Sequence, residues 1–172
     1  MKNGAFGAFR LHSHSVNYGT GSGQQSVTGY NGRDDPNSLW LVKGPHGKDC
    51  VPGTAVAKGA TIRLEHHATG KNLHSHLHSS PLSKQQEVSC YGENNTGDTG
   101  DNWEVRITTD YWMRGAEVRF QHSDTGKWLS MTGNAFGSPI HGQKEIVCSQ
   151  HNHDQAKWST EEGFYFPRNK EF

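Results

Sequence analysis

The stretch Arg63-Leu-Glu-His-His-Ala-Thr-Gly-Lys-Asn-Leu-His-Ser-His76 decides the fold of this chain, because it predicts a β-hairpin that recurs along the sequence. Apolar Ile62 and Leu64 alternate with charged residues, which is the two-residue period of a half-buried strand. Thr69-Gly-Lys71 predicts the turn, since glycine adopts a positive φ at little steric cost. Leu73 begins the return strand.

The same unit occurs three times. Residues 118–130 repeat the hairpin with a second Thr-Gly-Lys turn, and residues 11–14 repeat its return half. Each copy continues with a loop rich in Gly, Ser and Pro, a strand that opens with Gln, and then a Trp. The landmarks are Leu11, Leu73 and Leu129; Val27, Val88 and Ile146; and Trp40, Trp103 and Trp158. Successive copies are 62 and 56 residues apart at the Leu, 61 and 58 at the Val or Ile, and 63 and 55 at the Trp. This agreement indicates an internal threefold repeat.

Three copies of a four-strand unit predict an all-β fold, a β-trefoil with pseudo-threefold symmetry that forms a single domain over residues 1–172. Repeat 1 covers about residues 1–48, repeat 2 about 54–108 and repeat 3 about 111–166. Each copy would give two strands to a six-stranded barrel and two to a hairpin cap, with the Leu, Val or Ile, and Trp landmarks in the core. A β-propeller is the alternative, but three blades are too few to close one.

The first copy lacks most of its opening strand. Aligning Leu11 with Leu73 places Met1 opposite Arg63, in the middle of a hairpin arm. We therefore expect a trimmed N-terminus, with residues 2–9 irregular or weakly paired.

Charge and composition argue against several classes of function. The chain has 17 Lys and Arg and 17 Asp and Glu, so no net charge attracts it to nucleic acid or to an anionic membrane. No apolar run is long enough for a transmembrane helix. Hydrophobic content of 31% is low, but the chain lacks the high net charge and the scarcity of aromatic residues that are typical of disorder. We expect a folded monomer.

Two His-x-His pairs, His12 with His14 and His74 with His76, place two imidazoles on one strand face and could supply metal ligands. The third copy has Ser-Met-Thr at this position, and no carboxylate sits beside either pair in the sequence. The three Cys have no C-x-x-C spacing. We therefore favour structural or surface histidines and predict neither a metal site nor a cofactor.

No catalytic constellation is visible. The chain has no Gly-x-Ser-x-Gly motif and no Cys–His arrangement of a hydrolase. Glu87 and Glu145 occupy equivalent positions of copies two and three, but Ser26 takes that place in copy one. A repeated Glu does not by itself make an acid/base pair, so we predict that the protein is not an enzyme.

The repeats resemble the MIR domain, and the whole chain resembles the stromal cell-derived factor 2 family, whose members consist essentially of three MIR repeats. The strings that carry the resemblance are Arg10-Leu-His-Ser-His14, residues 18–28, 66–76, 81–89, 118–122 and 139–145, and Trp158 with Glu162-Gly163. The resemblance implies a β-trefoil protein of the endoplasmic reticulum lumen without known catalytic activity. It also implies association with lumenal Hsp70- and Hsp40-type chaperones and a link to protein quality control and O-mannosylation.

The chain departs from the family at several places. It has no apolar signal-peptide core at Met1, no Cys-containing first strand and no retention tetrapeptide at its end, and Ala57-Lys58 replaces a family Cys. We expect a lumenal or secreted protein whose signal peptide has been removed. Cys50 corresponds to a family Cys whose partners are missing here, so we expect Cys50 to be a free thiol.

Two function classes remain open. The first is a protein-interaction module that binds lumenal Hsp40- or Hsp70-type chaperones or client proteins. The alternative is a glycan-binding module linked to O-mannosylation, since β-trefoil lectins hold sugars in shallow pockets. An exposed polar pocket at Tyr111 or Trp112 would favour glycans, and an apolar patch would favour proteins.

The loops at residues 18–23, 78–84 and 134–141 differ most between copies, and we expect them near one end of the barrel. The candidate partner-binding residues there are Tyr18, Gln24, His76, Phe136 and His141. Asn94-Asn-Thr96 is an N-glycosylation sequon, which makes Asn94 a candidate modification site.

Overall fold

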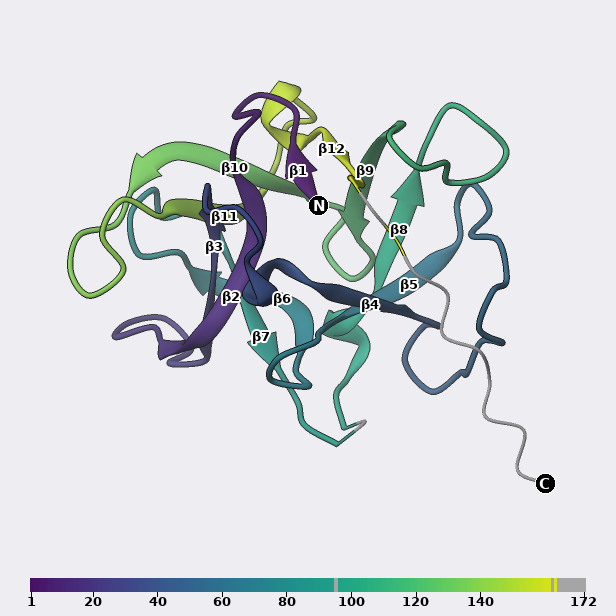
Figure 1. The fold of residues 1–172 in the computed structure, drawn as a ribbon. Helices are drawn as coiled ribbons and strands as arrows, with labels where there is room; N and C mark the ends of the chain where they lie inside the picture. The colour runs from purple at the N-terminus through teal and green to yellow at the C-terminus, as the bar shows by residue number, and fades with distance from the viewer. Residues whose placement is uncertain (95, 162, 164–172) are drawn as a thin grey trace.

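The computed structural model describes residues 1–94, 96–161 and 163. In this part of the chain there are twelve β-strands and three 3₁₀ turns (Figure 1), and no helix is long and apolar enough to cross a membrane. The strands are β1 (Lys2–Asn3), β2 (Arg10–Asn17), β3 (Gln25–Tyr30), β4 (Trp40–Lys43), β5 (Thr61–His66), β6 (Asn72–Ser79), β7 (Gln86–Tyr91), β8 (Trp103–Arg106), β9 (Glu117–His122), β10 (Trp128–Ala135), β11 (Lys144–Ser149) and β12 (Trp158–Ser159). The turns are η1 (Pro36–Ser38), η2 (Thr99–Asp101) and η3 (Asp154–Ala156).

Strand pairing repeats three times, which confirms the predicted β-trefoil. The hairpins β2–β3, β6–β7 and β10–β11 form the cap, and β3, β7 and β11 pair with one another at its centre. The pairs β4–β5, β8–β9 and β12–β1 join successive copies. The strands β5–β8 and β9–β12 pair within a copy, and among the described residues β1 and β4 do not.

The opening strand of the first copy is short, as expected from the alignment. β1 has two residues, whereas β5 and β9 have six each. Residues 4–9 lie outside any strand, and a turn closes there through the Phe9 amide, which donates to the Phe6 carbonyl at 2.7 Å.

The three landmark Trp residues occupy equivalent places. Each indole N–H donates to the carbonyl of the landmark Leu of its own copy, at 2.9 Å for Trp40, 2.9 Å for Trp103 and 3.0 Å for Trp158. Trp103 and Trp158 are fully buried, together with the landmark Leu, Val and Ile side chains. Trp40 is only half-buried, so the expectation of a buried Trp holds for two copies of three. It begins β4, the strand that lacks the pairing with β1.

Polar bridges join the copies inside the cap. Gln25 Nε2 donates to Ser13 Oγ at 2.8 Å and to Thr69 Oγ1 of the next copy at 2.9 Å. Gln86 makes the same two bonds one copy further, at 2.8 and 3.0 Å. The Thr-Gly-Lys turn is thus tied to the preceding copy through its Thr hydroxyl.

The third of these junctions lacks the Gln bridge of the other two. Met131 stands where the other copies have a Ser, and Gly29 stands where they have Cys90 and Cys148. A Cβ on Gly29 would lie 2.5 Å from Met131 Cε, so the glycine makes room for the larger side chain. Lys144, which replaces the bridging Gln, places its ammonium 4.9 Å from the ring centre of Phe6.

Candidate functional site

The three variable loops lie together at one end of the molecule, as predicted (Figure 1). They follow the cap strands β2, β6 and β10, whose last residues leave the regular pairing at register shifts between Ser13 and Asn17, Ser75 and Ser79, and Met131 and Ala135. We call residues 14–24, 76–85 and 132–143 the cap end. Its loops extend from the hydrogen-bonded hairpins of the cap, so the scaffold beneath them is rigid.

Glu145 anchors the loop of copy two to copy three. Its side chain is fully buried, and Oε1 accepts from the amides of Leu82 at 2.9 Å and Ser83 at 3.0 Å. Thr132 Oγ1 donates to Oε2 at 3.1 Å. The carboxylate thus replaces water as the acceptor for two loop amides.

Glu87 anchors the loop of copy one to copy two in a similar way. The amide of Ser22 donates to Oε2 at 3.3 Å, its hydroxyl bonds Oε1, and His76 Nε2 lies 3.1 Å from Oε1. Gly21 has a φ of 64°, and a Cβ there would lie 2.0 Å from Glu87 Oε2. Only glycine allows the loop to approach the carboxylate this closely.

No glutamate of copy one anchors the loop of copy three, because Ser26 stands at the equivalent position, and Asn134 Nδ2 of this loop donates to Glu145 Oε2 of its own copy at 3.4 Å. Ser26 Oγ donates to the Val16 carbonyl of its own copy at 2.7 Å. The loop closes on itself through the Phe136 amide, which donates to the Gln143 carbonyl at 2.8 Å. Its side-chain contact with copy one is made by Gln143 Oε1, which lies 3.1 Å from His14 Nε2 and accepts from the hydroxyl of Thr28. The loops are therefore anchored unequally.

The charge state of the anchors fits this structural role. Burial alone would raise the pKa of Glu145, but the amides of Ser83 and Leu82 hold that pKa below its usual value. Burial likewise acts to raise the pKa of Glu87, and His76 and Ser22 hold it lower than usual. Both carboxylates are thus ionised at neutral pH, with their oxygens bonded to loop groups.

Tyr18 does not belong to the surface, which corrects the prediction. Its side chain is 7% exposed, and its hydroxyl lies 3.0 Å from the Val27 carbonyl and 2.9 Å from the Val88 carbonyl. The Val27 amide donates to the same oxygen at 3.2 Å. Burial raises the pKa of this phenol. The ring fills the junction between copies one and two and is not available to a partner.

The other predicted residues remain accessible at the cap end. His141 is exposed, and Gln24, His76 and Phe136 are half-buried. Gln24 Oε1 accepts from the hydroxyl of Ser89 in β7 at 2.5 Å, and this bond fixes the orientation of the Gln24 side-chain amide.

Leu77 is a cap-end residue that the sequence reasoning missed. It is 85% exposed, more than any other large apolar side chain in the described part of the chain. Leu82, in the same copy, is 40% exposed. A copy-by-copy alignment carries the signal, because the equivalents of Leu77 are Ser15 and Gly133.

The first histidine of each pair has a carboxylate partner that is distant in the sequence, which fits the structural role expected for these residues. His12 Nδ1 lies 2.6 Å from Asp35 Oδ2, and His74 Nδ1 lies 2.8 Å from Asp101 Oδ1. These carboxylates come from the regions of η1 and η2, more than 20 residues along the chain. Burial lowers the pKa of His12, and the contact with Asp35 opposes this shift. The contacts tie β2 and β6 to the turns that precede the landmark Trp.

His74, Asp98 and Asp101 form a group whose donor atoms lie within 4.8 Å of one another and could hold a metal ion. Their hydrogen bonds already have a structural use. Asp98 Oδ1 accepts from the Gly100 amide at 2.8 Å, and Asp101 Oδ2 accepts from the Asp98 amide at 3.2 Å. This is a capping box on η2, so we assign the group to the turn.

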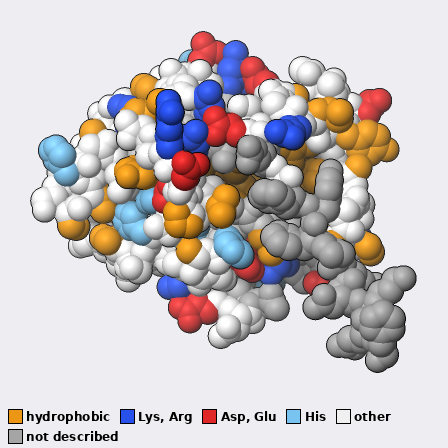
Figure 2. Space-filling view, in the orientation of Figure 1, with side chains coloured by type: hydrophobic (Ala, Val, Ile, Leu, Met, Phe, Trp, Pro, Cys, Tyr) orange, Lys and Arg blue, Asp and Glu red, His pale blue; other side chains and the backbone are white. Residues whose placement is uncertain are grey.

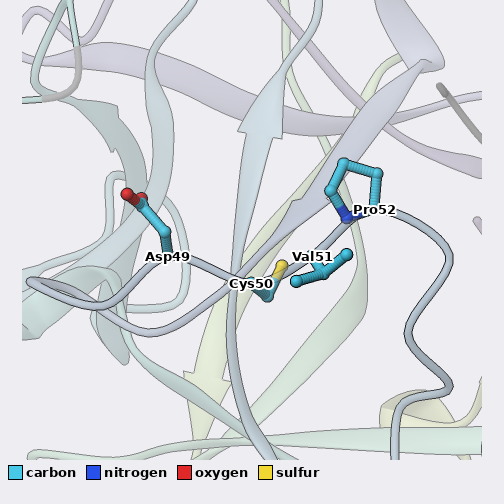
Figure 3. Close-up of a pocket in the computed structure, with 4 residues that line it drawn as sticks. All are labelled: Asp49, Cys50, Val51 and Pro52. Carbon is cyan, nitrogen blue, oxygen red and sulfur yellow. The ribbon is translucent and has the colours of Figure 1, made fainter. Parts of the chain in front are cut away.

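The remaining candidates lie away from the cap end. Asn94 is exposed in the loop after β7. Tyr111 is 53% exposed, and the half-buried Trp112 packs edge-on against Phe120 with ring centres 5.4 Å apart. A shallow hollow elsewhere is lined by the four consecutive residues 49–52 (Figure 3), so neither aromatic ring lines it.

The cysteines are unpaired in the structure. Cys50 is exposed, Cys90 and Cys148 are buried, and all three are free. This confirms that Cys50 bridges to neither of the others. Burial raises the pKa of both Cys90 and Cys148 to about 12, so these two thiols are unreactive.

A comparison with protein families matches residues 9–160 to the MIR domain. The chain is 56% identical over 163 residues to the stromal cell-derived factor 2-like protein of Dictyostelium discoideum, an alignment that covers 92% of this chain and 77% of that one. It belongs to the stromal cell-derived factor 2 family of MIR-domain proteins. It is 49% identical to human stromal cell-derived factor 2, with 91% and 74% of the two chains covered.

Several solved structures have the same fold. The crystal structure of the SDF2-like protein from Arabidopsis thaliana superposes with a TM-score of 0.89 at 46% identity, covering 94% of this chain and 91% of that one. The protein O-mannosyltransferase Pmt1–Pmt2 complex of S. cerevisiae matches at a TM-score of 0.83 and 31% identity, covering 92% of this chain but 23% of that one. A designed threefold-symmetric protein, ThreeFoil, matches at 0.52 and 17% identity over 87% of each chain, and supports the trefoil fold alone.

Proposed function

We propose that this MIR protein is a non-catalytic protein-interaction module of the endoplasmic reticulum lumen that acts with Hsp40- and Hsp70-type chaperones in protein quality control. The observation that carries the proposal is the cap end itself. Two of its loops are anchored by buried carboxylates, and it presents the exposed side chains of Leu77 and Leu82. Membership of the stromal cell-derived factor 2 family supports the same reading.

Anchored loops suit protein binding on energetic grounds. A loop that is already ordered loses little conformational freedom when a partner binds, so more of the contact energy appears as affinity. Glu87 and Glu145 use their oxygens to order the loops, which leaves them no role as a proton-transfer pair.

Calorimetric titration of the purified protein with a lumenal Hsp40-type co-chaperone, alone and with its Hsp70, tests the proposal. We expect saturable binding that Phe136→Ala weakens about tenfold, the factor that 1.4 kcal/mol produces. Tyr111→Ala is the matched control, because Tyr111 is also an accessible aromatic residue but lies outside the cap end.

A folded protein that binds neither chaperone would contradict the proposal. Binding to a mannose-glycan array by the same preparation would then identify a glycan-binding module instead. Circular dichroism of each variant checks that folding is unchanged.

A further inference from the structure

The cap end is depleted of charge. Lys84 is the one Asp, Glu, Lys or Arg residue within residues 14–24, 76–85 and 132–143, whereas these residue types make up 20% of the whole chain. The two nearby glutamates, Glu87 and Glu145, are fully buried and face the loop amides. Figure 2 shows this end, at the left, mainly in white, orange and pale blue, with Lys, Arg, Asp and Glu gathered elsewhere on the same face.

Depletion of charge distinguishes the centre of a protein interface from the rest of a surface. A charged group of a partner would lose hydration here. The fixed charges that it would meet are Lys84 and, at the border of the third segment, Lys144, whose ammonium donates to the Gly133 carbonyl at 3.1 Å. A surface that serves solubility alone would not avoid charge over three separate segments.

The large aliphatic side chains that are exposed at the cap end, Leu77 and Leu82, both belong to copy two. Leu77 is 85% exposed within the bulge of β6, where the other copies have Ser15 and Gly133. Leu82 adds a second exposed aliphatic side chain in the same hairpin, and its amide is fixed by Glu145. The backbone repeats but the aliphatic contacts do not, so the trefoil fold does not require them.

We propose that the cap end binds an uncharged segment, rich in aliphatic side chains, of a partner protein, with Leu77 as the principal contact. The inference rests on the proposed function and names the chemistry of the partner. Low charge on one surface matches low charge on the other, since neither side then buries an unpaired ion.

The test uses the full chain and a peptide of Leu, Val, Ser and Gly that has blocked termini and an uncharged fluorophore, read by fluorescence anisotropy. We expect binding whose affinity stays within about twofold when salt rises several-fold, because no ion pair is screened. Replacing two Ser of the peptide by Asp, or by Lys, should weaken binding about tenfold.

Variants locate the contact. Leu77→Ser, which installs the residue type of copy one, should weaken peptide binding about tenfold, and Leu82→Ser should weaken it less. Met113→Ser is the matched control, because Met113 is 56% exposed in the loop before β9 and should leave the affinity unchanged. The substituted side chains are exposed, and circular dichroism verifies the fold.

Several results would overturn the inference. These are tighter, salt-sensitive binding of the Asp or Lys peptide, equal affinity of Leu77→Ser and the parent, or sedimentation showing that the parent forms a dimer that Leu77→Ser abolishes. Co-chaperone binding without peptide binding would reject this inference and leave the proposed function. Peptide binding without co-chaperone binding would support the inference and reject the chaperone partnership.

Discussion

Replacing Glu145 with glutamine keeps the size of a buried side chain and removes its charge. The amides of Leu82 and Ser83 then donate to a neutral oxygen instead of a carboxylate, at sites now 2.9 and 3.0 Å from Oε1. A hydrogen bond to a charged group contributes about 1.5–3 kcal/mol and a neutral one about 0.5–1.5 kcal/mol. Weakening two such bonds should therefore lower the free energy of unfolding by about 2 kcal/mol. In a domain of this length that corresponds to about 4–8 °C in Tm.

The pH dependence of the stability difference between the parent and Glu145→Gln is a second, independent test of the anchoring role. Although burial alone raises the pKa of Glu145, the amides of Ser83 and Leu82 hold it below its usual value. A carboxyl with a lowered folded-state pKa stabilises the fold fully above its unfolded pKa, about 4.3, and loses this contribution as the pH falls through the folded pKa. Glu145→Gln has no such contribution. The difference between parent and variant should therefore be complete at pH 7 and shrink below about pH 4.

Urea unfolding followed by Trp fluorescence measures both effects. Glu93→Gln is the control, because Glu93 pairs with Lys71 at 3.1 Å but its side chain is 64% exposed, and its loss should change stability by less than about 0.5 kcal/mol. If Glu145→Gln is as stable as the parent, or if the difference between them is the same at pH 7 and at about pH 3.5, the anchoring role is wrong.

Three further outcomes follow from the core. Gly29→Ala should destabilise by about 1–3 kcal/mol, and combined with Met131→Ser it should cost less than the sum of the single changes in a double-mutant cycle of urea unfolding. Titration with Ellman's reagent should find one fast thiol, Cys50, in the native protein and three after unfolding; three fast thiols in the native state would contradict the burial of the others. Trp103→Phe should cost about 1–2 kcal/mol more than Trp40→Phe by thermal unfolding, because both changes remove a bond to a buried Leu carbonyl but only Trp103 is itself fully buried.

The fold could be predicted because its landmarks carry the symmetry. Each landmark Trp bonds to the landmark Leu of its own copy, so both residues recur at the same offset in the sequence. Their burial could not be predicted equally well. Trp40 and Trp103 look alike in the alignment, yet Trp40 begins β4, which has no pairing with β1 in the described residues. Burial at this position depends on a strand contact that the local pattern does not contain.

The site could be predicted only in part. The loops were located correctly, because the copies differ there and the fold brings equivalent loops to one end. The orientation of the Tyr18 side chain was not predictable, since its equivalents are Ser80 and Phe136 and the local sequence does not indicate which of these side chains points inward. The partner of His12 was missed because Asp35 lies 23 residues away and approaches only when η1 folds over β2. The sequence therefore revealed the residues that recur in every copy, but it did not reveal contacts between residues that are far apart in the chain.

The departures from symmetry predict one partner per chain. Three identical copies would offer three identical sites around the cap, and a ligand of one site would bind with a stoichiometry of three. Here the aliphatic contact is Leu77 in copy two, against Ser15 and Gly133, and the glutamate anchor is replaced by Ser26 in copy one. The three sites therefore differ both in their exposed side chains and in the anchoring of their loops, and we expect calorimetry to give a stoichiometry near one.

Ser15→Leu is the sharpest perturbation, because it adds an exposed leucine beside the anchored loop of copy one. A second, weaker site in that variant would identify Leu as the determinant, whereas a stoichiometry near three for the parent would show that the shared backbone, and not Leu77, makes the site.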